Sequence, residues 1–123
     1  MQKTIVAVDD EECIRRLIKL ALDAEGFDCQ IAADGEEGLN KIKEIRPDMV
    51  LLDVMMNKLN GYEVVEAMRK DVDLKDIAVV ILSARDKDLG LLDNQKELPP
   101  VNEYLSKPFD LNKLVATVKK YLD

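Results

Sequence analysis

Two adjacent carboxylates follow the first apolar run of this sequence. The run from Thr4 to Val8 has the pattern of a buried strand, and it ends directly in Asp9 and Asp10. Like charges this close repel each other, and burial strengthens the repulsion because less solvent screens it. A later run of the same kind ends in a third acid, Asp53. A single acid after a strand is usually the cap of a helix, but three acids in one place would need a cation.

A hydroxyl and an amine follow two further apolar runs. The run from Ile77 to Leu82 ends in Ser83, and Lys107 follows the run from Val101 to Leu105. Taken alone, Lys107 before a proline would indicate only a turn. The combination of acids, hydroxyl and amine, each after a strand, is therefore more informative than any one of these residues.

The elements that must position these residues alternate between strands and helices. Apolar and alternating patterns predict five strands, around residues 4–8, 27–33, 49–52, 77–82 and 101–105. Helical periodicity, with Gly26 as a C-terminal cap and Asp34 and Asp110 as N-terminal caps, predicts helices around residues 14–22, 35–45, 61–68 and 111–122. A helix within residues 86–98 is harder to predict, because Gly90 and the pair Pro99-Pro100 interrupt its pattern.

Strands that alternate with helices form a parallel sheet covered by helices on both faces. In such sheets the functional site lies at the carboxyl ends of the strands. The three acids, Ser83 and Lys107 all follow strands in the sequence. We therefore expect them to meet at one end of the sheet.

Length and charge limit the class of protein. The 123 residues indicate one domain, residues 1–123. A net charge of −7 disfavours direct nucleic-acid binding, which depends on Lys and Arg against phosphates. No apolar run approaches the roughly 20 residues that span a bilayer. Because no signal peptide precedes the first acids either, we expect a cytoplasmic protein that does not contact the membrane.

The counts of histidine and cysteine exclude several kinds of catalysis. The sequence has no histidine, so Ser-His and Cys-His nucleophiles and His-ligated metals are excluded. Cys13 and Cys29 have no metal-binding or redox spacing, and we expect both to be buried free thiols.

The full set of motifs resembles the receiver domains of two-component response regulators, single-domain relatives such as the chemotaxis regulator included. The motifs are "VDDEE" (residues 8–12), "LLDVMM" (51–56), "NGYE" (60–63), "ILSAR" (81–85) and "YLSKPF" (104–109). The resemblance covers the whole chain. It implies an α/β fold of the flavodoxin type, with a five-stranded parallel sheet in the order 2-1-3-4-5 and helices on both faces.

The resemblance also implies a role for each polar residue. Asp53 is expected to accept a phosphoryl group, with Lys107 and Ser83 each binding one phosphoryl oxygen. Mg²⁺ is the expected cofactor, because a hard cation is suited to carboxylates, water and an incoming phosphate. Its expected ligands are Asp10, Asp53 and the main-chain carbonyl of Met55, with Asp9 acting through water.

Signalling is the expected output rather than turnover of a substrate. The donor would be a phosphohistidine of a sensor histidine kinase or phosphotransfer protein, and the domain would assist its own phosphorylation and autodephosphorylation. Ser83 would then move toward the phosphate, and Tyr104 would turn inward behind it. The expected downstream partners are an effector or output domain, and a homodimer formed on phosphorylation.

This chain departs from the usual receiver sequence in three places. Asn57 stands where many receivers have proline, and "LPPVNEYL" replaces the usual Gly-Ala before the last strand. Ser83 and Lys107 are 24 positions apart (107 minus 83), slightly more than is common. The first difference predicts a looser loop after Asp53, and the other two leave open the helix after Ser83 and with it the usual output face.

Three other functions remain as alternatives. A haloacid dehalogenase-type phosphatase also uses Asp, Mg²⁺, Ser/Thr and Lys, but it needs an acid two positions after the nucleophile, where this chain has Met55. An inert receiver-like interaction domain would not need the intact set of acids, hydroxyl and amine. A flavin-binding domain would need a Ser/Thr/Gly-rich phosphate loop after the first strand, where this chain has acids.

Overall fold

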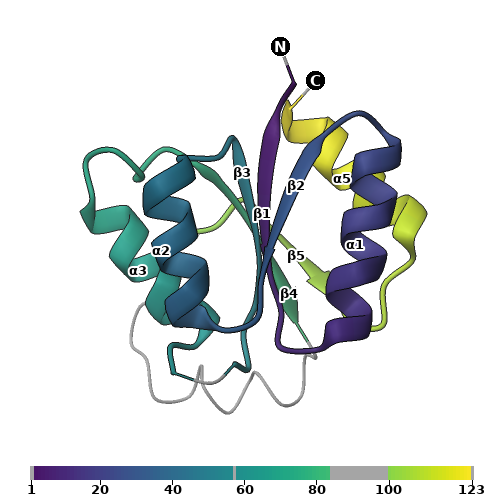
Figure 1. Cartoon of the computed structure of the whole chain (residues 1–123). Helices are drawn as coiled ribbons and strands as arrows, with labels where there is room; N and C mark the ends of the chain where they lie inside the picture. Colours follow the sequence, from purple (N-terminus) through teal and green to yellow (C-terminus); the bar gives the residue numbers. More distant parts are fainter. Residues whose placement is uncertain (1, 57, 84–99, 123) are drawn as a thin grey trace.

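The computed structural model of the chain describes residues 2–56, 58–83 and 100–122, and for Ser83 the backbone alone. Its centre is a five-stranded parallel sheet in the order β2-β1-β3-β4-β5 (Figure 1). The strands are β1 (Thr4–Val8), β2 (Asp28–Ala32), β3 (Met49–Asp53), β4 (Ala78–Ser83) and β5 (Glu103–Ser106). The helices are α1 (Glu12–Ala24), α2 (Gly35–Ile45), α3 (Gly61–Lys70) and α5 (Leu111–Leu122). The predicted fold class and strand order are therefore confirmed.

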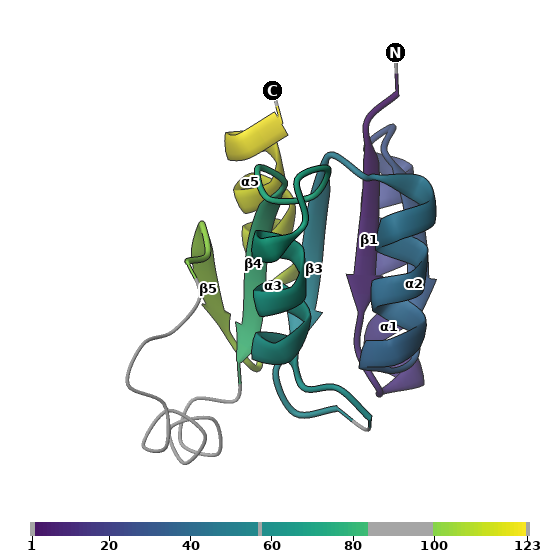
Figure 2. The same ribbon diagram turned by 90° about the vertical axis from the view of Figure 1, so that its left-hand side faces the viewer.

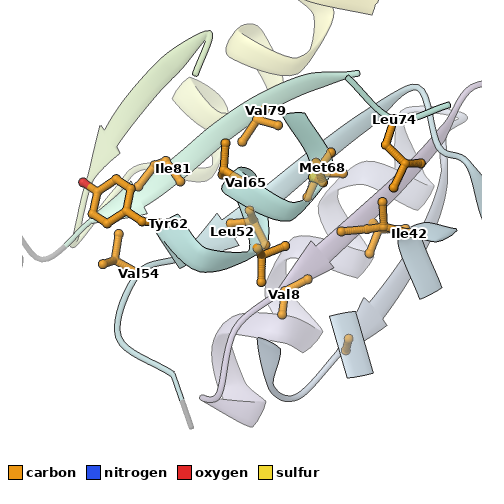
Figure 3. Packing of buried hydrophobic residues seen from close by; sticks show 14 residues of the cluster. Val8, Ile42, Leu52, Val54, Tyr62, Val65, Met68, Leu74, Val79 and Ile81 are labelled. Atoms are coloured by element: carbon orange, nitrogen blue, oxygen red, sulfur yellow. The ribbon is translucent and has the colours of Figure 1, made fainter. Parts of the chain in front are cut away.

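Helices cover both faces of the sheet, as expected for a parallel sheet. Figure 2 shows α2 and α3 on one face, with α5 behind the sheet. Each face has its own apolar cluster, and Figure 3 shows the one under α2 and α3, where Leu52 and Val65 meet. Every residue of β3 is buried, which explains why its sequence is an unbroken apolar run rather than an alternating pattern.

The predicted helix caps are present. The Asp34 side chain accepts a hydrogen bond from the Glu37 N–H at 2.8 Å and starts α2. Gly26 follows α1 with a φ of +91°, a left-handed conformation that glycine adopts at little cost. The Asp110 carboxylate accepts a 2.7 Å hydrogen bond from the N–H of Asn112 in α5. Local side-chain chemistry therefore determines where these helices begin and end.

Two expectations about α1 are wrong in detail. Helical periodicity puts Leu17 on the same apolar face as Ile18 and Leu22, but 44% of its surface is exposed, since it lies at the border of that face. Cys13 is exposed, because it precedes the apolar stripe formed by Ile18 and Leu22. Cys29 is buried as expected, and burial, with Asp23 adding to it, raises the pKa of its thiol to about 12. That thiol is therefore protonated and unreactive.

The boundaries of β5 differ slightly from the prediction. The strand begins at Glu103 rather than at Val101, because Asn102 uses its side chain to bond the Val79 N–H at 2.9 Å. The uncertain helix within residues 86–98 and the departure at Asn57 lie outside the described residues. In the part of the chain that is described, no helix is both long and apolar enough to cross a membrane.

Candidate functional site: a carboxylate pocket at the carboxyl end of the sheet

Three acids from two strands gather at the carboxyl end of the sheet. Asp9 and Asp10 follow β1, and Asp53 ends β3, the strand paired with β1. One carboxylate oxygen from each of the three lies within 4.8 Å of the others. Asp9 and Asp53 are buried, whereas Asp10 is exposed. The predicted convergence of these acids is therefore a feature of the structure.

The carboxylate of Asp9 already has a partner for each oxygen. Its Oδ1 accepts a hydrogen bond from the Glu11 N–H at 2.9 Å. Its Oδ2 accepts one from the Lys107 ammonium at 2.7 Å. The guanidinium of Arg15 donates to the main-chain carbonyl of Asp9 at 2.8 Å and fixes the backbone there. Both carboxylate oxygens of Asp9 thus accept a hydrogen bond from the protein. The carboxylates of Asp10 and Asp53 are therefore better placed to bind a ligand directly.

The ammonium of Lys107 joins the acids. Its Nζ lies 3.4 Å from Asp53 Oδ1 and 3.8 Å from Glu11 Oε1, and its side chain is only 14% exposed. Burial alone would lower the pKa of Lys107. The hydrogen bond to Asp9 and the charge of Asp53 outweigh burial and raise the pKa above its usual range. Lys107 is therefore positively charged in this pocket at neutral pH.

The ionised form of Asp53 is destabilised by its surroundings. Burial is the main cause that raises the pKa of Asp53, and the charges of Asp9 and Asp10 raise it further. The opposing effect of Lys107 is smaller, so that the pKa reaches about 7. Among the described residues, Lys107 is the one cationic side chain that forms ion pairs with these three acids, so their negative charges exceed its positive charge. A proton or a metal ion at Asp53 would reduce that excess.

The "NGYE" motif holds Asp53 in place. Gly61 starts α3 so close to β3 that a Cβ there would lie 2.6 Å from the Asp53 carbonyl oxygen. Asn60 and Glu63 form a capping box, each side chain accepting from the backbone N–H of the other at 2.9 Å. The N–H of Gly61 also bonds the carbonyl of Val54 at 2.9 Å. The start of α3 is thereby fixed against the chain that carries Asp53.

The other predicted site residues lie on β4 and β5 and directly after β3. The backbone of Ser83 ends β4 beside Ser106 of β5, while its side chain lies outside the described part. Tyr104 is 47% exposed on β5, which is an outward position. Met55 follows β3 and is 46% exposed. The structure therefore brings Asp9, Asp10, Asp53 and Lys107 together, and the roles assigned to all of these residues stay predictions.

Sequence patterns did not identify Glu11 and Arg15 as parts of the site. Both lie at the start of α1, where Glu11 reaches Lys107 and Arg15 reaches the Asp9 carbonyl. Their spacing of four residues would have placed them on one helical side next to Asp9. An apolar hollow of about 350 Å³ adjoins them, lined by Glu11, Ile14, Leu17, Lys107, Pro108, Phe109 and Leu111.

Comparison with known proteins identifies the family. A family model described as the response regulator receiver domain matches residues 5–119. The alkaline phosphatase synthesis transcriptional regulatory protein PhoP of Bacillus subtilis is 38% identical over 126 residues, covering 99% of this chain and 49% of PhoP. The chain spans about half the length of the curated relatives it matches.

Solved receiver structures share the fold. The chemotaxis response regulator CheY4 of Vibrio cholerae superposes with a TM-score of 0.82 at 29% identity, covering 98% of this chain and 99% of CheY4. The receiver domain of the sensor histidine kinase PA1611 of Pseudomonas aeruginosa, solved with a magnesium ion in its active site cleft, gives a TM-score of 0.86 at 22% identity. It covers 99% of this chain and 98% of that domain. This chain belongs to the receiver domain family of two-component response regulators, which are signalling domains rather than enzymes of the usual kind.

Proposed function

We propose that this chain is a phosphoacceptor that takes a phosphoryl group onto Asp53 from a phosphohistidine of a sensor histidine kinase or phosphotransfer protein. The observation that supports this most strongly is the position of Lys107. Its Nζ bonds buried Asp9 at 2.7 Å and remains 3.4 Å from Asp53 Oδ1. An ammonium held there would form an ion pair with a phosphoryl oxygen once the phosphorus is bonded to Asp53.

The transfer forms one bond and breaks another. An ionised oxygen of Asp53 attacks the phosphorus, the phosphorus–nitrogen bond of phosphohistidine breaks, and the imidazole leaves with the bonding electron pair. The negative charge is spread over three phosphoryl oxygens, so positioned cations and hydroxyls contribute most of the catalysis. Lys107 would bind one of these oxygens and the Ser83 hydroxyl another. Attack of water on the phosphorus would later break the phosphorus–oxygen bond to Asp53, which returns Asp53 to its carboxylate and releases inorganic phosphate.

The residues of the pocket fit Mg²⁺. Three carboxylates share one end of the sheet with Lys107, whose ammonium lies between those of Asp9 and Asp53. Mg²⁺ prefers oxygen ligands and usually keeps several waters, so two available carboxylates suffice. Asp10, Asp53 and the main-chain carbonyl of Met55 would hold it, with Asp9 acting through water. When bound, the ion would neutralise charge on the phosphoryl group.

A conformational response would follow phosphorylation. The phosphate offers Ser83 a strong acceptor, and movement of that residue would leave space for Tyr104, which is half exposed in the present structure. The change would reach an effector or output domain, or a second copy of the domain. In support, the chain covers about half of PhoP, whose name describes a transcriptional regulatory protein.

The surface near the pocket offers the donor protein an apolar contact area. The apolar hollow beside Lys107 lies within reach of any protein that presents a phosphohistidine to Asp53. Leu17 in this hollow is 44% exposed. We propose that the donor packs against it while its histidine enters the pocket.

A small phosphodonor tests the assignment without the partner kinase. The protein would be incubated with Mg²⁺ and phosphoramidate, and its intact mass followed with time. We expect one added phosphoryl group in the wild type and in Asp76→Asn, an exposed acid at the opposite end of the sheet. We expect none in Asp53→Asn, and little when the metal is chelated. Addition to Asp53→Asn at the wild-type rate would overturn the proposal.

A further inference from the structure

The free edge of β2 is the lateral border of the sheet next to α1 and α2. β2 is the terminal strand of the sheet, and among the described residues it pairs with β1 alone (Figure 1). The N–H of Asp28 donates to the Lys3 carbonyl, and the Ala32 carbonyl accepts from the Asp9 N–H. The backbone N–H and carbonyl groups of the even-numbered residues of β2 therefore face β1. The backbone groups of Cys29, Ile31 and Ala33 therefore point away from the sheet. Such an edge is a template for another strand unless something occupies it.

A lysine–aspartate pair of α1 occupies the first of these positions. The Lys19 ammonium donates to the Cys29 carbonyl at 2.7 Å. The Asp23 carboxylate accepts from the Cys29 N–H at 3.2 Å. The two side chains are one helical turn apart and also bond each other at 3.1 Å. Both outward groups of Cys29 are therefore saturated by a single ion pair.

A second pair, from α2, occupies the next positions. The Lys41 ammonium donates to the Ile31 carbonyl at 2.6 Å. The Glu37 carboxylate accepts from the Ala33 N–H at 3.2 Å. Lys41 and Glu37 are again four residues apart and lie 3.8 Å from each other. The helices on opposite faces of the sheet thus each extend one acid and one base around the same edge.

We propose that these two pairs keep the β2 edge closed to strand addition by a second copy of the chain. The hydrogen bonds they make are those that an added strand would need. All four charged side chains are at least one-third exposed. Exposed ion pairs contribute little to stability by themselves. Their consistent position on the outward backbone groups is explained better by protection of the edge than by stabilisation.

A second copy is the expected occupant because the strand is self-complementary. An antiparallel pair centred on Gln30 would place Cys29 of each copy opposite Ile31 of the other. Outward N–H and carbonyl groups would then match in both directions. Apolar surface lies beside the edge: Leu20 is 68% exposed and lines a hollow of about 290 Å³ with Ile31. Burial of that surface would favour association once the lysines no longer occupy the carbonyls.

The test removes the donors and keeps the length of the side chains. In Lys19→Met/Lys41→Met, methionine cannot donate to a carbonyl. The matched control is Lys43→Met/Lys75→Met, which makes the same chemical change at two exposed lysines away from the edge. Unphosphorylated, metal-free proteins would be compared by sedimentation over a range of concentrations. We expect the edge variant to double its mass, or to assemble further, while the wild type and the control do not.

Two more measurements distinguish edge pairing from general aggregation. Hydrogen exchange should show new protection of the amides of residues 29–33 in the associated edge variant. Lys19→Arg/Lys41→Arg retains donors and should behave as the wild type. An edge variant that is folded by circular dichroism and keeps the wild-type mass would overturn the proposal. So would association in which the amides of residues 29–33 gain no protection, or association of the control variant to the same extent.

Discussion

Replacement of Asp53 by Asn should stabilise the metal-free protein at neutral pH. The Asp53 side chain is only 7% exposed and lies beside Asp9 and Asp10, and within residues 2–56, 58–83 and 100–122 its one ion-pair partner is Lys107. Asn has nearly the same shape as protonated Asp but carries no charge. The substitution therefore removes the repulsion and leaves the packing against α3 in place.

The pH dependence follows from the pKa of Asp53. The pKa rises from 3.8 to about 7 on folding, mainly through burial and then through Asp9. Between these values the folded state holds the proton more firmly, so wild-type stability should fall as pH rises from about 4 to 7. Three pKa units correspond to about 4 kcal/mol as an upper limit. Because Asp10 of the same cluster is exposed, solvent screens part of these charges, and we expect about 2 kcal/mol, or about 8 °C in Tm.

Urea denaturation followed by circular dichroism would measure this difference. The free energy of unfolding would be compared for wild type and Asp53→Asn at several values between pH 4 and pH 8 with a chelator present. The chain has no histidine, so few other groups titrate between about pH 5.5 and pH 8, and the ordinary carboxylates that titrate near pH 4 are common to both proteins. The two proteins should be equally stable near pH 4, and the variant should be more stable at pH 8. Asp76→Asn, an exposed substitution, should follow the wild type throughout.

Two results would show that ionised Asp53 does not destabilise the metal-free protein. One is a wild-type protein whose stability changes no more between pH 4 and pH 8 than that of Asp53→Asn. The other is a variant less stable than wild type at pH 8, which would mean that the Asp53 carboxylate is a net stabilising partner of Lys107. Addition of Mg²⁺ provides an internal check, since it should stabilise the wild type and have little effect on the variant.

Further predictions concern the surroundings of the pocket. Lys107→Met should destabilise the protein by about 3 kcal/mol in urea denaturation, because it leaves buried Asp9 without its cation; unchanged stability would show that Asp9 needs no partner. Gly61→Ala should cost about 1–3 kcal/mol and shift the amide NMR signal of Asp53, since its Cβ would lie 2.6 Å from the Asp53 carbonyl oxygen; unchanged signals would contradict the close approach. Met55→Asn should speed loss of the phosphoryl group, measured as decay of the added mass, because methionine cannot orient water; an unchanged decay rate would exclude that role.

Much of the fold was predictable because its signals are local. The all-apolar β3 indicates a strand covered on both faces, and its sequence alone shows that burial. Asp34 and Gly26 define the ends of helices through bonds within a few residues. The exposure of Leu17 was missed, because periodicity predicts a buried face but not where its border lies.

The candidate site was predictable as a set of residues but not as a geometry. Parallel strands bring their carboxyl ends together, which explains why Asp9, Asp53 and Lys107 could be grouped from the sequence. That Asp9 is buried and committed while Asp10 is exposed depends on the direction in which each side chain leaves the end of β1. The bond from Arg15 to a main-chain carbonyl is invisible in sequence patterns, because a carbonyl has no residue-specific signature.

Locating the phosphoryl group in the sequence tests most directly whether Asp53 is the phosphoacceptor. The protein would be phosphorylated with phosphoramidate and Mg²⁺, treated with borohydride, which reduces an aspartyl phosphate to homoserine, and sequenced by tandem mass spectrometry. We expect homoserine at position 53 and aspartate at positions 9 and 10. Homoserine at position 9 or 10, with Asp53 unmodified, would show that Asp53 is not the phosphoacceptor.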